Sequence, residues 1–109
     1  MNLLDKKCVP CEGGAPPLAP EEIKKLQSQL TGPWQLIGQK KIQREFKFKD
    51  FMAALVFVNS VATLAEAEGH HPDITIHYDQ VIIELWTHAI GGLSENDFIL
   101  AAKIEKTNA

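Results

Sequence analysis

Residues 74–85 constrain the fold most, because they predict two strands joined by a very short turn. Apolar residues occupy every second position of Ile74–Tyr78 and again of Val81–Leu85. This is the period of a half-buried strand. Only Asp79 and Gln80 separate the two runs, so the sequence predicts a hairpin with a two-residue turn.

The predicted turn also sets a register between the two strands. This register collects the apolar residues on one face by pairing Tyr78 with Val81, Ile76 with Ile83, and Ile74 with Leu85. Continued to the open end, it places Pro72 opposite Thr87 and His71 opposite His88. Opposed residues in such a ladder lie roughly 4.5–5.5 Å apart. With His70 beside His71, the sequence therefore predicts three imidazoles at one site.

Three gathered imidazoles are suited to proton transfer near neutral pH. An unperturbed imidazole has a pKa of about 6.5, so one ring can donate a proton while another accepts one, as a dehydration requires. Three histidines can alternatively hold zinc with an open fourth position, although adjacent histidines on an extended backbone point in different directions. The simplest alternative assigns His70 and His71 to a helix end and His88 to a solvated strand end.

Further residues with characteristic spacing surround the histidines. The set comprises Glu66, His70-His71-Pro72, Tyr78, Thr87-His88, Gly92-Leu93-Ser94-Glu95 and Asp97. In these motifs the chain resembles the pterin-4a-carbinolamine dehydratase family. The resemblance extends from about Pro33 to Lys106 and takes in Trp34 and the segment Phe46–Phe51.

The resemblance implies a hydro-lyase that converts 4a-hydroxytetrahydrobiopterin to quinonoid dihydropterin without a metal or cofactor. It assigns catalysis to His70, His71 and His88. The substrate-binding residues that it implies are His70, His71, Pro72, Thr87, His88, Ala89 and Ile90. A role in tetrahydrobiopterin recycling, beside an aromatic amino-acid hydroxylase, follows from the same resemblance. Some relatives in the family also act as dimerisation partners of a homeodomain transcription factor, so a binding module that uses the apolar helix 50–67 is the alternative function.

The chain departs from the family pattern at two positions. Gly69 stands where some members carry an acid, and Ile74 stands where an aromatic residue is common. Both departures leave the three histidines intact. Asp97 belongs to the pattern, but a helix-capping role is enough to explain it.

Composition narrows the possible partners. The chain has 109 residues and a formal net charge of −3, and it contains no long basic run. These features argue against nucleic-acid and membrane-surface binding. We expect a cytoplasmic protein, because the sequence shows no signal peptide and no run of transmembrane length.

The remaining chain predicts a flexible leader over residues 1–19 and a single domain over 20–109. Cys8 and Cys11 in the leader are expected to be unbonded thiols, with a zinc shared between subunits as the alternative. In the domain, the pattern predicts helix 20–30, strands 34–37 and 41–49, helix 50–67, the histidine hairpin, a helix from Ser94, and a polar tail from Lys103. Arg44 interrupts the apolar face of its strand and is expected to be solvated, or else to contact an anion or a substrate. The fold class is α+β, with a single four-stranded antiparallel sheet and three helices on one face.

The helix predicted over residues 50–67 has almost no polar face. A helix that is apolar all round is buried on more than one side, and a chain of this size can cover only one side with its own sheet. We therefore expect a homodimer or a homotetramer, with a hydrophobic ligand pocket as the alternative.

Overall fold

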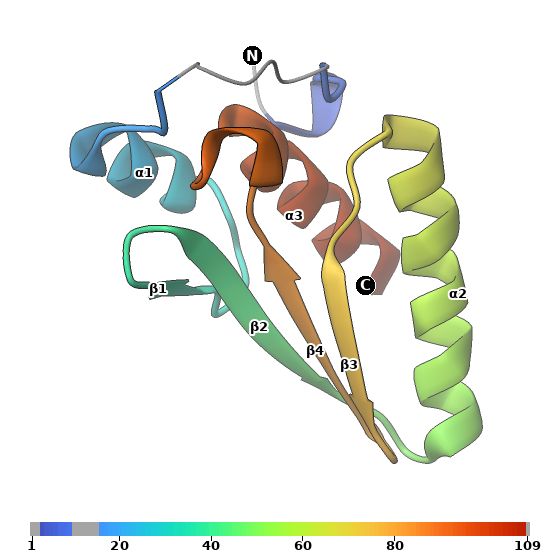
Figure 1. The fold of residues 1–109 in the computed structure, drawn as a ribbon. Helices are drawn as coiled ribbons and strands as arrows, with labels where there is room; N and C mark the ends of the chain where they lie inside the picture. The colour runs from blue at the N-terminus through green and yellow to red at the C-terminus, as the bar shows by residue number, and fades with distance from the viewer. Residues whose placement is uncertain (1–2, 10–15, 109) are drawn as a thin grey trace.

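The computed structural model describes residues 3–9 and 16–108 and contains one four-stranded antiparallel sheet with helices on one face (Figure 1). The elements are η1 (Leu3–Asp5), α1 (Pro20–Gln27), β1 (Gln35–Ile37), β2 (Lys41–Lys47), α2 (Phe51–Glu68), β3 (Asp73–His77), β4 (Gln80–Leu85), η2 (His88–Ile90) and α3 (Glu95–Asn108). The strands lie in the order β1-β2-β4-β3. The predicted α+β class is confirmed.

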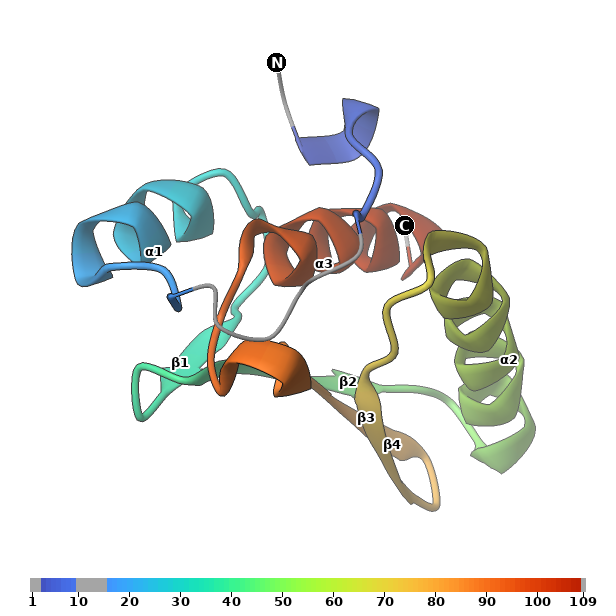
Figure 2. The same ribbon diagram turned by 45° about the horizontal axis from the view of Figure 1, so that its top comes forward.

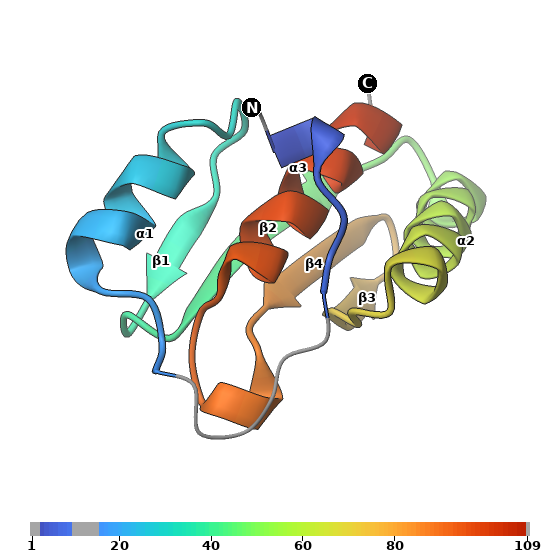
Figure 3. The same cartoon turned by 90° about the horizontal axis from the view of Figure 1, so that it is seen from above.

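The helices form a single layer over the sheet. Figures 2 and 3 show α3 in the middle of this layer, α1 on the β1 side and α2 on the β3 side. The core lies between the layers, where Val81, Ile83 and Leu85 of β4 and Phe98 and Leu100 of α3 are fully buried. Within the described part of the chain, no helix covers the opposite face of the sheet, which carries alternate residues of the strands.

Helix α2 has a specific signal at each end. The carboxylate of Asp50 accepts a hydrogen bond from the Ala53 backbone N–H at 2.8 Å, so the predicted N-cap is confirmed. At the other end Gly69 adopts a left-handed φ of 69°, and its N–H caps the Ala65 carbonyl at 2.9 Å. Glycine takes this conformation without steric cost. The cap ends the helix and turns the chain directly into His70.

Only one side of α2 is buried. Ala54, Phe57, Val61 and Ala65 face the core, while Met52 and Val56 on the other side are 66% and 63% exposed. No run of transmembrane length was expected from the sequence, but α2 is long and apolar enough to span a membrane by length and composition. Core helices of water-soluble proteins pass the same test.

The β3–β4 register differs from the predicted one. The observed pairs are Asp73–Glu84, Ile74–Ile83, Thr75–Ile82, Ile76–Val81 and His77–Gln80. The turn therefore consists of Tyr78 and Asp79, and Tyr78 takes a left-handed φ of 55°. The predicted pairing of His71 with His88 is wrong, because β3 begins at Asp73 and β4 ends at Leu85.

Contacts from the neighbouring strand account for this shift. Lys47 of β2 lies opposite Gln80, and its Nζ is 3.1 Å from an Asp79 carboxylate oxygen. The Phe48 N–H donates to the Asp79 carbonyl at 2.8 Å. A shift of two positions keeps every side chain on its own face, so the predicted apolar face survives the change.

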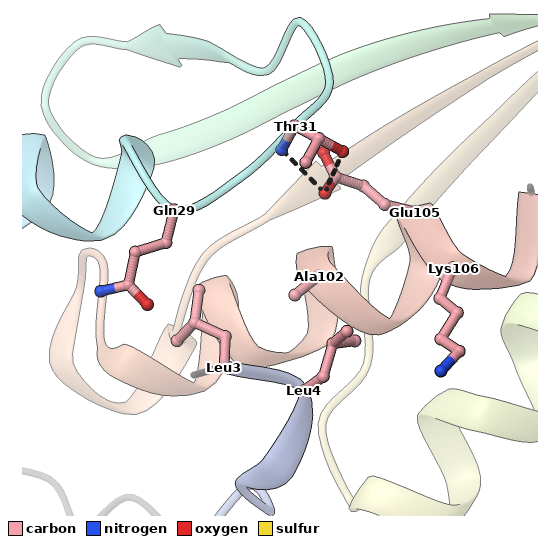
Figure 4. Close-up of a pocket in the computed structure, with 7 residues that line it drawn as sticks. All are labelled: Leu3, Leu4, Gln29, Thr31, Ala102, Glu105 and Lys106. Atoms are coloured by element: carbon pink, nitrogen blue, oxygen red, sulfur yellow. Dashed lines mark hydrogen bonds between the residues drawn. The ribbon is translucent and has the colours of Figure 1, made fainter. Parts of the chain in front are cut away.

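The predicted polar tail is instead the second half of α3. Ile104 within it is fully buried, and Glu105 accepts hydrogen bonds from the α1–β1 connection, including the Gly32 N–H at 2.5 Å and the Trp34 indole at 2.9 Å. Figure 4 shows its two bonds to Thr31. Arg44 also contacts Glu105 at 3.5 Å from the core face of β2, so the expectation of a solvated arginine is wrong.

Part of the leader packs against the domain. Leu3 is buried, η1 lies on α3, and the Val9 N–H donates to the Asn96 side chain at 3.0 Å. The domain boundary at residue 19 stays a prediction, as does the state of the cysteine pair, because Cys11 lies outside the described residues. Cys8 is a free thiol.

Candidate active site

The three predicted histidines line one cavity beside the open end of the β3–β4 hairpin. Its volume is about 420 Å³, within the range of small-molecule sites. The lining residues are Gly69, His70, His71, Pro72, Asp73, Trp86, Thr87, His88 and Ala89. His70 and His71 reach it from the loop after α2, and His88 reaches it from η2. The two loops bring the histidines together, although His71 and His88 are not paired in the β3–β4 hairpin.

His70 is held by a buried carboxylate. Its Nε2 lies 2.6 Å from Oδ1 of Asp97, and the two side chains are 12% and 0% exposed. The second oxygen of Asp97 accepts from the Ser94 N–H and from the Thr87 hydroxyl, each at 2.9 Å. These bonds satisfy a carboxylate that has lost its water, as a buried charge requires. Asp97 therefore joins His70, the β4–η2 connection and the start of α3.

The Asp97 contact also orients the His70 ring. A carboxylate accepts hydrogen bonds, so the nitrogen facing it carries the proton. In neutral His70, Nε2 is then the N–H and Nδ1 presents the lone pair. A ring fixed in this way can accept a proton at Nδ1, and the carboxylate stabilises the imidazolium that forms.

His71 is held more loosely than His70. Its Nε2 contacts Glu66 of the last turn of α2, and both side chains are exposed. Exposed ion pairs contribute little to stability, about 0–1 kcal/mol. His71 can therefore change rotamer to meet a ligand, whereas His70 is fixed.

His88 lies at the start of η2, in a loop closed by the Thr87 N–H donating to the Gly92 carbonyl at 2.8 Å. Its ring stacks on the Trp86 indole, with centroids 3.9 Å apart and planes at 30°. Within residues 3–9 and 16–108, the His88 ring has no hydrogen-bond partner. Both of its nitrogens are therefore free to meet a ligand.

The sequence-predicted residues mostly coincide with this cavity. Pro72, Thr87 and Ala89 line it, whereas Ile90, at the end of η2, is not among the lining residues. Sequence reasoning missed Asp73 and Trp86, and it assigned Asp97 a capping role alone. The capping bond to Ser94 does exist, but it uses only one of the two Asp97 oxygens.

A partly buried ion pair lies just behind the site. Glu68, immediately before Gly69, accepts from Lys103 Nζ at 2.8 Å and from the Cys8 N–H at 2.9 Å. Burial acts to raise the Glu68 pKa, but the Lys103 and Cys8 hydrogen bonds outweigh it and hold that pKa below its usual value. Burial, and next the Glu68 charge, raise the pKa of the Cys8 thiol to about 12, so this thiol stays protonated at neutral pH.

The lowered pKa of Glu68 predicts a pH-dependent stability. Because the folded-state pKa lies below the unfolded value of 4.5, the stabilisation is complete above that value and is lost as the pH falls through the folded pKa. We expect Glu68→Gln to lower the free energy of unfolding by about 2 kcal/mol at pH 7, because a charge-assisted bond is lost. In denaturant titrations from pH 7 down to pH 3, this difference should shrink. The exposed Glu21→Gln serves as the control, and a pH-independent difference for Glu68→Gln would contradict the assignment.

A second cavity lacks the chemistry of the histidine site. The cavity of about 300 Å³ in Figure 4 lies between η1 and α3, and its carboxylate, Glu105, is already occupied by backbone and side-chain donors. Among the described residues, no three His, Cys, Asp or Glu side chains are arranged as metal ligands.

Comparisons with known proteins agree on one family. Residues 16–107 match the family described as Pterin 4 alpha carbinolamine dehydratase. A Rickettsia bellii protein provisionally named pterin-4-alpha-carbinolamine dehydratase is 53% identical over 104 residues, covering 95% of this chain and 92% of the relative. An Alkaliphilus metalliredigens protein with the same provisional name is 51% identical, covering 96% of this chain and 95% of the relative.

Two solved structures resemble the fold. The transcriptional coactivator/pterin dehydratase from Brucella melitensis is 35% identical, with a TM-score of 0.80 over 85% of this chain and 99% of its own. A pterin dehydratase-like protein identified as a RuBisCO assembly factor in the alpha-carboxysome is 23% identical, with a TM-score of 0.60 over 70% of this chain and 89% of its own. The second likeness concerns the fold alone.

Proposed function

Because this chain belongs to the pterin 4 alpha carbinolamine dehydratase family, we propose that it dehydrates 4a-hydroxytetrahydrobiopterin to quinonoid dihydropterin by histidine acid–base catalysis. The observation that carries this proposal is the His70, His71 and His88 cavity, with His70 oriented by buried Asp97. The reaction removes the C4a hydroxyl as water and the proton from N5. One group must donate a proton to the leaving hydroxyl and another must accept the N5 proton, with no change of oxidation state.

The contacts suit His70 to the base role and His88 to the acid role. The Asp97 carboxylate faces Nε2 of His70, so Nδ1 is the accepting nitrogen and the resulting charge is stabilised. His88 has both nitrogens available, so it can carry a proton to the leaving hydroxyl. His71 positions the pterin ring, and the backbone of Pro72 and of 87–89 supplies further substrate contacts.

Turnover of the carbinolamine tests this proposal directly. We expect wild-type protein to accelerate its dehydration above the buffer rate, whether or not the protein has been treated with a chelator. Chelation should have no effect because His70 and His88 supply both of the proton transfers that the proposed reaction requires. A rate equal to that of buffer would refute the activity, and a rate lost on chelation would favour the zinc hypothesis.

The proposed activity also gives the protein a place in metabolism. Dehydrating the carbinolamine restores a pterin that a reductase can return to the tetrahydro form, as tetrahydrobiopterin recycling requires. A functional link to an aromatic amino-acid hydroxylase and a cytoplasmic location are part of the proposal.

A protein-binding role is the alternative function. It is favoured by the exposed Phe51, Met52 and Val56 on α2 and by the coactivator description of the Brucella relative. Such binding would not need the histidines. Substituting His88 should therefore abolish pterin turnover and leave any protein partnership unchanged.

We also propose that α2 joins two copies of the chain. Met52, Val56, Asn59 and Thr63 form an exposed stripe along the helix. Monomers rarely expose an apolar patch beyond a few hundred Å², and a two-fold axis is the commonest way to cover one with a second copy. An exposed sheet edge could then join two such dimers into a tetramer.

If α2 joins two copies of the chain, negative charge introduced on its exposed stripe should separate them. Met52→Glu combined with Val56→Glu should convert the oligomer to a smaller species in sedimentation velocity, because four carboxylates would meet across the two-fold axis. Turnover should largely survive, since His70, His71 and His88 all reach the cavity from the same chain. Tyr78→Glu, an equally exposed position at the hairpin tip, is the control. A wild-type monomer at micromolar concentration would refute the assembly and leave the catalytic proposal intact.

A further inference from the structure

Trp86 occupies an unusual position for a large aromatic residue. Alternation along β4 buries Val81, Ile83 and Leu85 under the helices, so Glu84 and Trp86 fall on the open face of the sheet. Thr87 keeps an extended backbone, with φ −104° and ψ 104°. His88 is therefore on the same side as Trp86, two residues further along the chain.

Asp73 fixes the Trp86 indole. Asp73 is the first residue of β3 and pairs with Glu84, so it is the diagonal neighbour of Trp86 across the two strands. Trp86 Nε1 donates to Asp73 Oδ2 at 3.0 Å. The two acids, Asp73 and Glu84, can lie opposite one another because Glu84 is bound by Gln43 Nε2 at 2.7 Å and by Lys41 at 3.4 Å.

His88 depends on this aromatic ring for its orientation. Its side chain is exposed, and within residues 3–9 and 16–108 no hydrogen bond restrains its ring. The contact that fixes the plane of the imidazole is the stack on Trp86 at 3.9 Å. The site thus orients His70 and His88 by different means, with a carboxylate for His70 and a ring face for His88.

We propose that Trp86, held by Asp73, is the positioning residue for His88. This inference rests on the proposed dehydratase function and specifies which residues keep the acid in place. Trp86 lines the cavity, but its indole N–H is bound to Asp73, so the ring face that it turns to His88 is set before any substrate arrives. Loss of the stack should release His88 to other rotamers while leaving the rest of the cavity intact.

Kinetics separate positioning from substrate contact. Trp86→Leu should lower kcat by on the order of 10–100-fold with little change in KM, because catalytic geometry is lost while the binding surface remains. Trp86→Phe keeps a ring for stacking and should recover most of the rate. Asp73→Leu removes the acceptor of the indole and should resemble Trp86→Leu, whereas Asp73→Asn, which keeps an acceptor, should lose less of the rate than Asp73→Leu. An increase in KM alone would show that Trp86 contacts the substrate, and an unchanged kcat in Trp86→Leu would overturn the proposal.

NMR of the imidazole protons provides a test that does not depend on turnover. Stacking on an indole shifts the His88 ring protons upfield, and Trp86→Leu should move them toward free-histidine values. The resonances of His77, at the far end of β3, should not move. If wild type lacks dehydratase activity but the His88 shift follows Trp86, the proposed function fails and the orienting contact stands. If the shift is insensitive to Trp86, the positioning role is refuted whatever the activity.

Discussion

Alanine at His70 or at His88 is expected to lower kcat/KM for carbinolamine dehydration by on the order of 10²–10⁴-fold, the usual contribution of a general acid or base. Each substitution removes one of the two proton-transfer groups from the cavity. His71→Ala should have a smaller effect that falls mainly on KM, because His71 is exposed and held only by Glu66. The measurement is initial-rate kinetics with the rate in buffer subtracted.

His77→Ala is the matched control for this series. His77 lies at the end of β3 opposite Gln80, outside the histidine cavity, and its loss should leave the kinetics unchanged. Thermal unfolding of each variant separates lost chemistry from lost folding. Full dehydration rates in both His70→Ala and His88→Ala would show that the acid–base assignment is wrong.

The elements of this fold were predictable because each carries local signals. Asp50 before an apolar run and Gly69 after it mark the ends of α2 through capping chemistry that acts within one turn. Alternation gave the strands and their buried faces. The hairpin register was not predictable, because it depends on Lys47 and Phe48 of β2 holding Asp79, and these contacts cross between strands. Accommodating them forces Tyr78, a residue that disfavours positive φ, into the turn.

The candidate site was predicted in part, and for a reason that proved incorrect. The three histidines do line one cavity, but two loops place them there, not the predicted pairing of His71 with His88. The other contacts of the site were missed because they join residues that lie far apart in the chain. Asp97 is 27 positions from His70 in the chain, and a nearby Ser94 already accounted for an acid at that position. Trp86 resembled an ordinary strand residue, since nothing local reveals that its indole meets Asp73.

Asp97→Asn is expected to reduce kcat by on the order of 10²–10⁴-fold while KM changes little, since a wrongly oriented or wrongly protonated imidazole cannot act as the base. The amide keeps the size of the carboxylate. Its oxygen can still accept from the Ser94 N–H and the Thr87 hydroxyl, which leaves its NH₂ group facing Nε2 of His70. That nitrogen must then accept a hydrogen bond, so the ring proton moves to Nδ1 and the lone pair is lost from the reactive position. Nitrogen-15 NMR of the His70 ring should report Nε2–H in wild type and Nδ1–H in the variant.

The dual role of Asp97 makes the choice of control decisive. Ser94→Ala removes the hydroxyl contact to Thr87 at 2.7 Å beside the cap, yet it leaves the His70–Asp97 bond in place. If capping were the whole role of Asp97, Asp97→Asn would keep the bond to the Ser94 N–H, and both variants would retain activity. If Asp97 orients His70, only Asp97→Asn loses its rate and changes its tautomer. Asp97→Ala would be a poorer test, because it leaves buried donors unpaired and opens a cavity, so a loss of folding would be mistaken for a loss of chemistry.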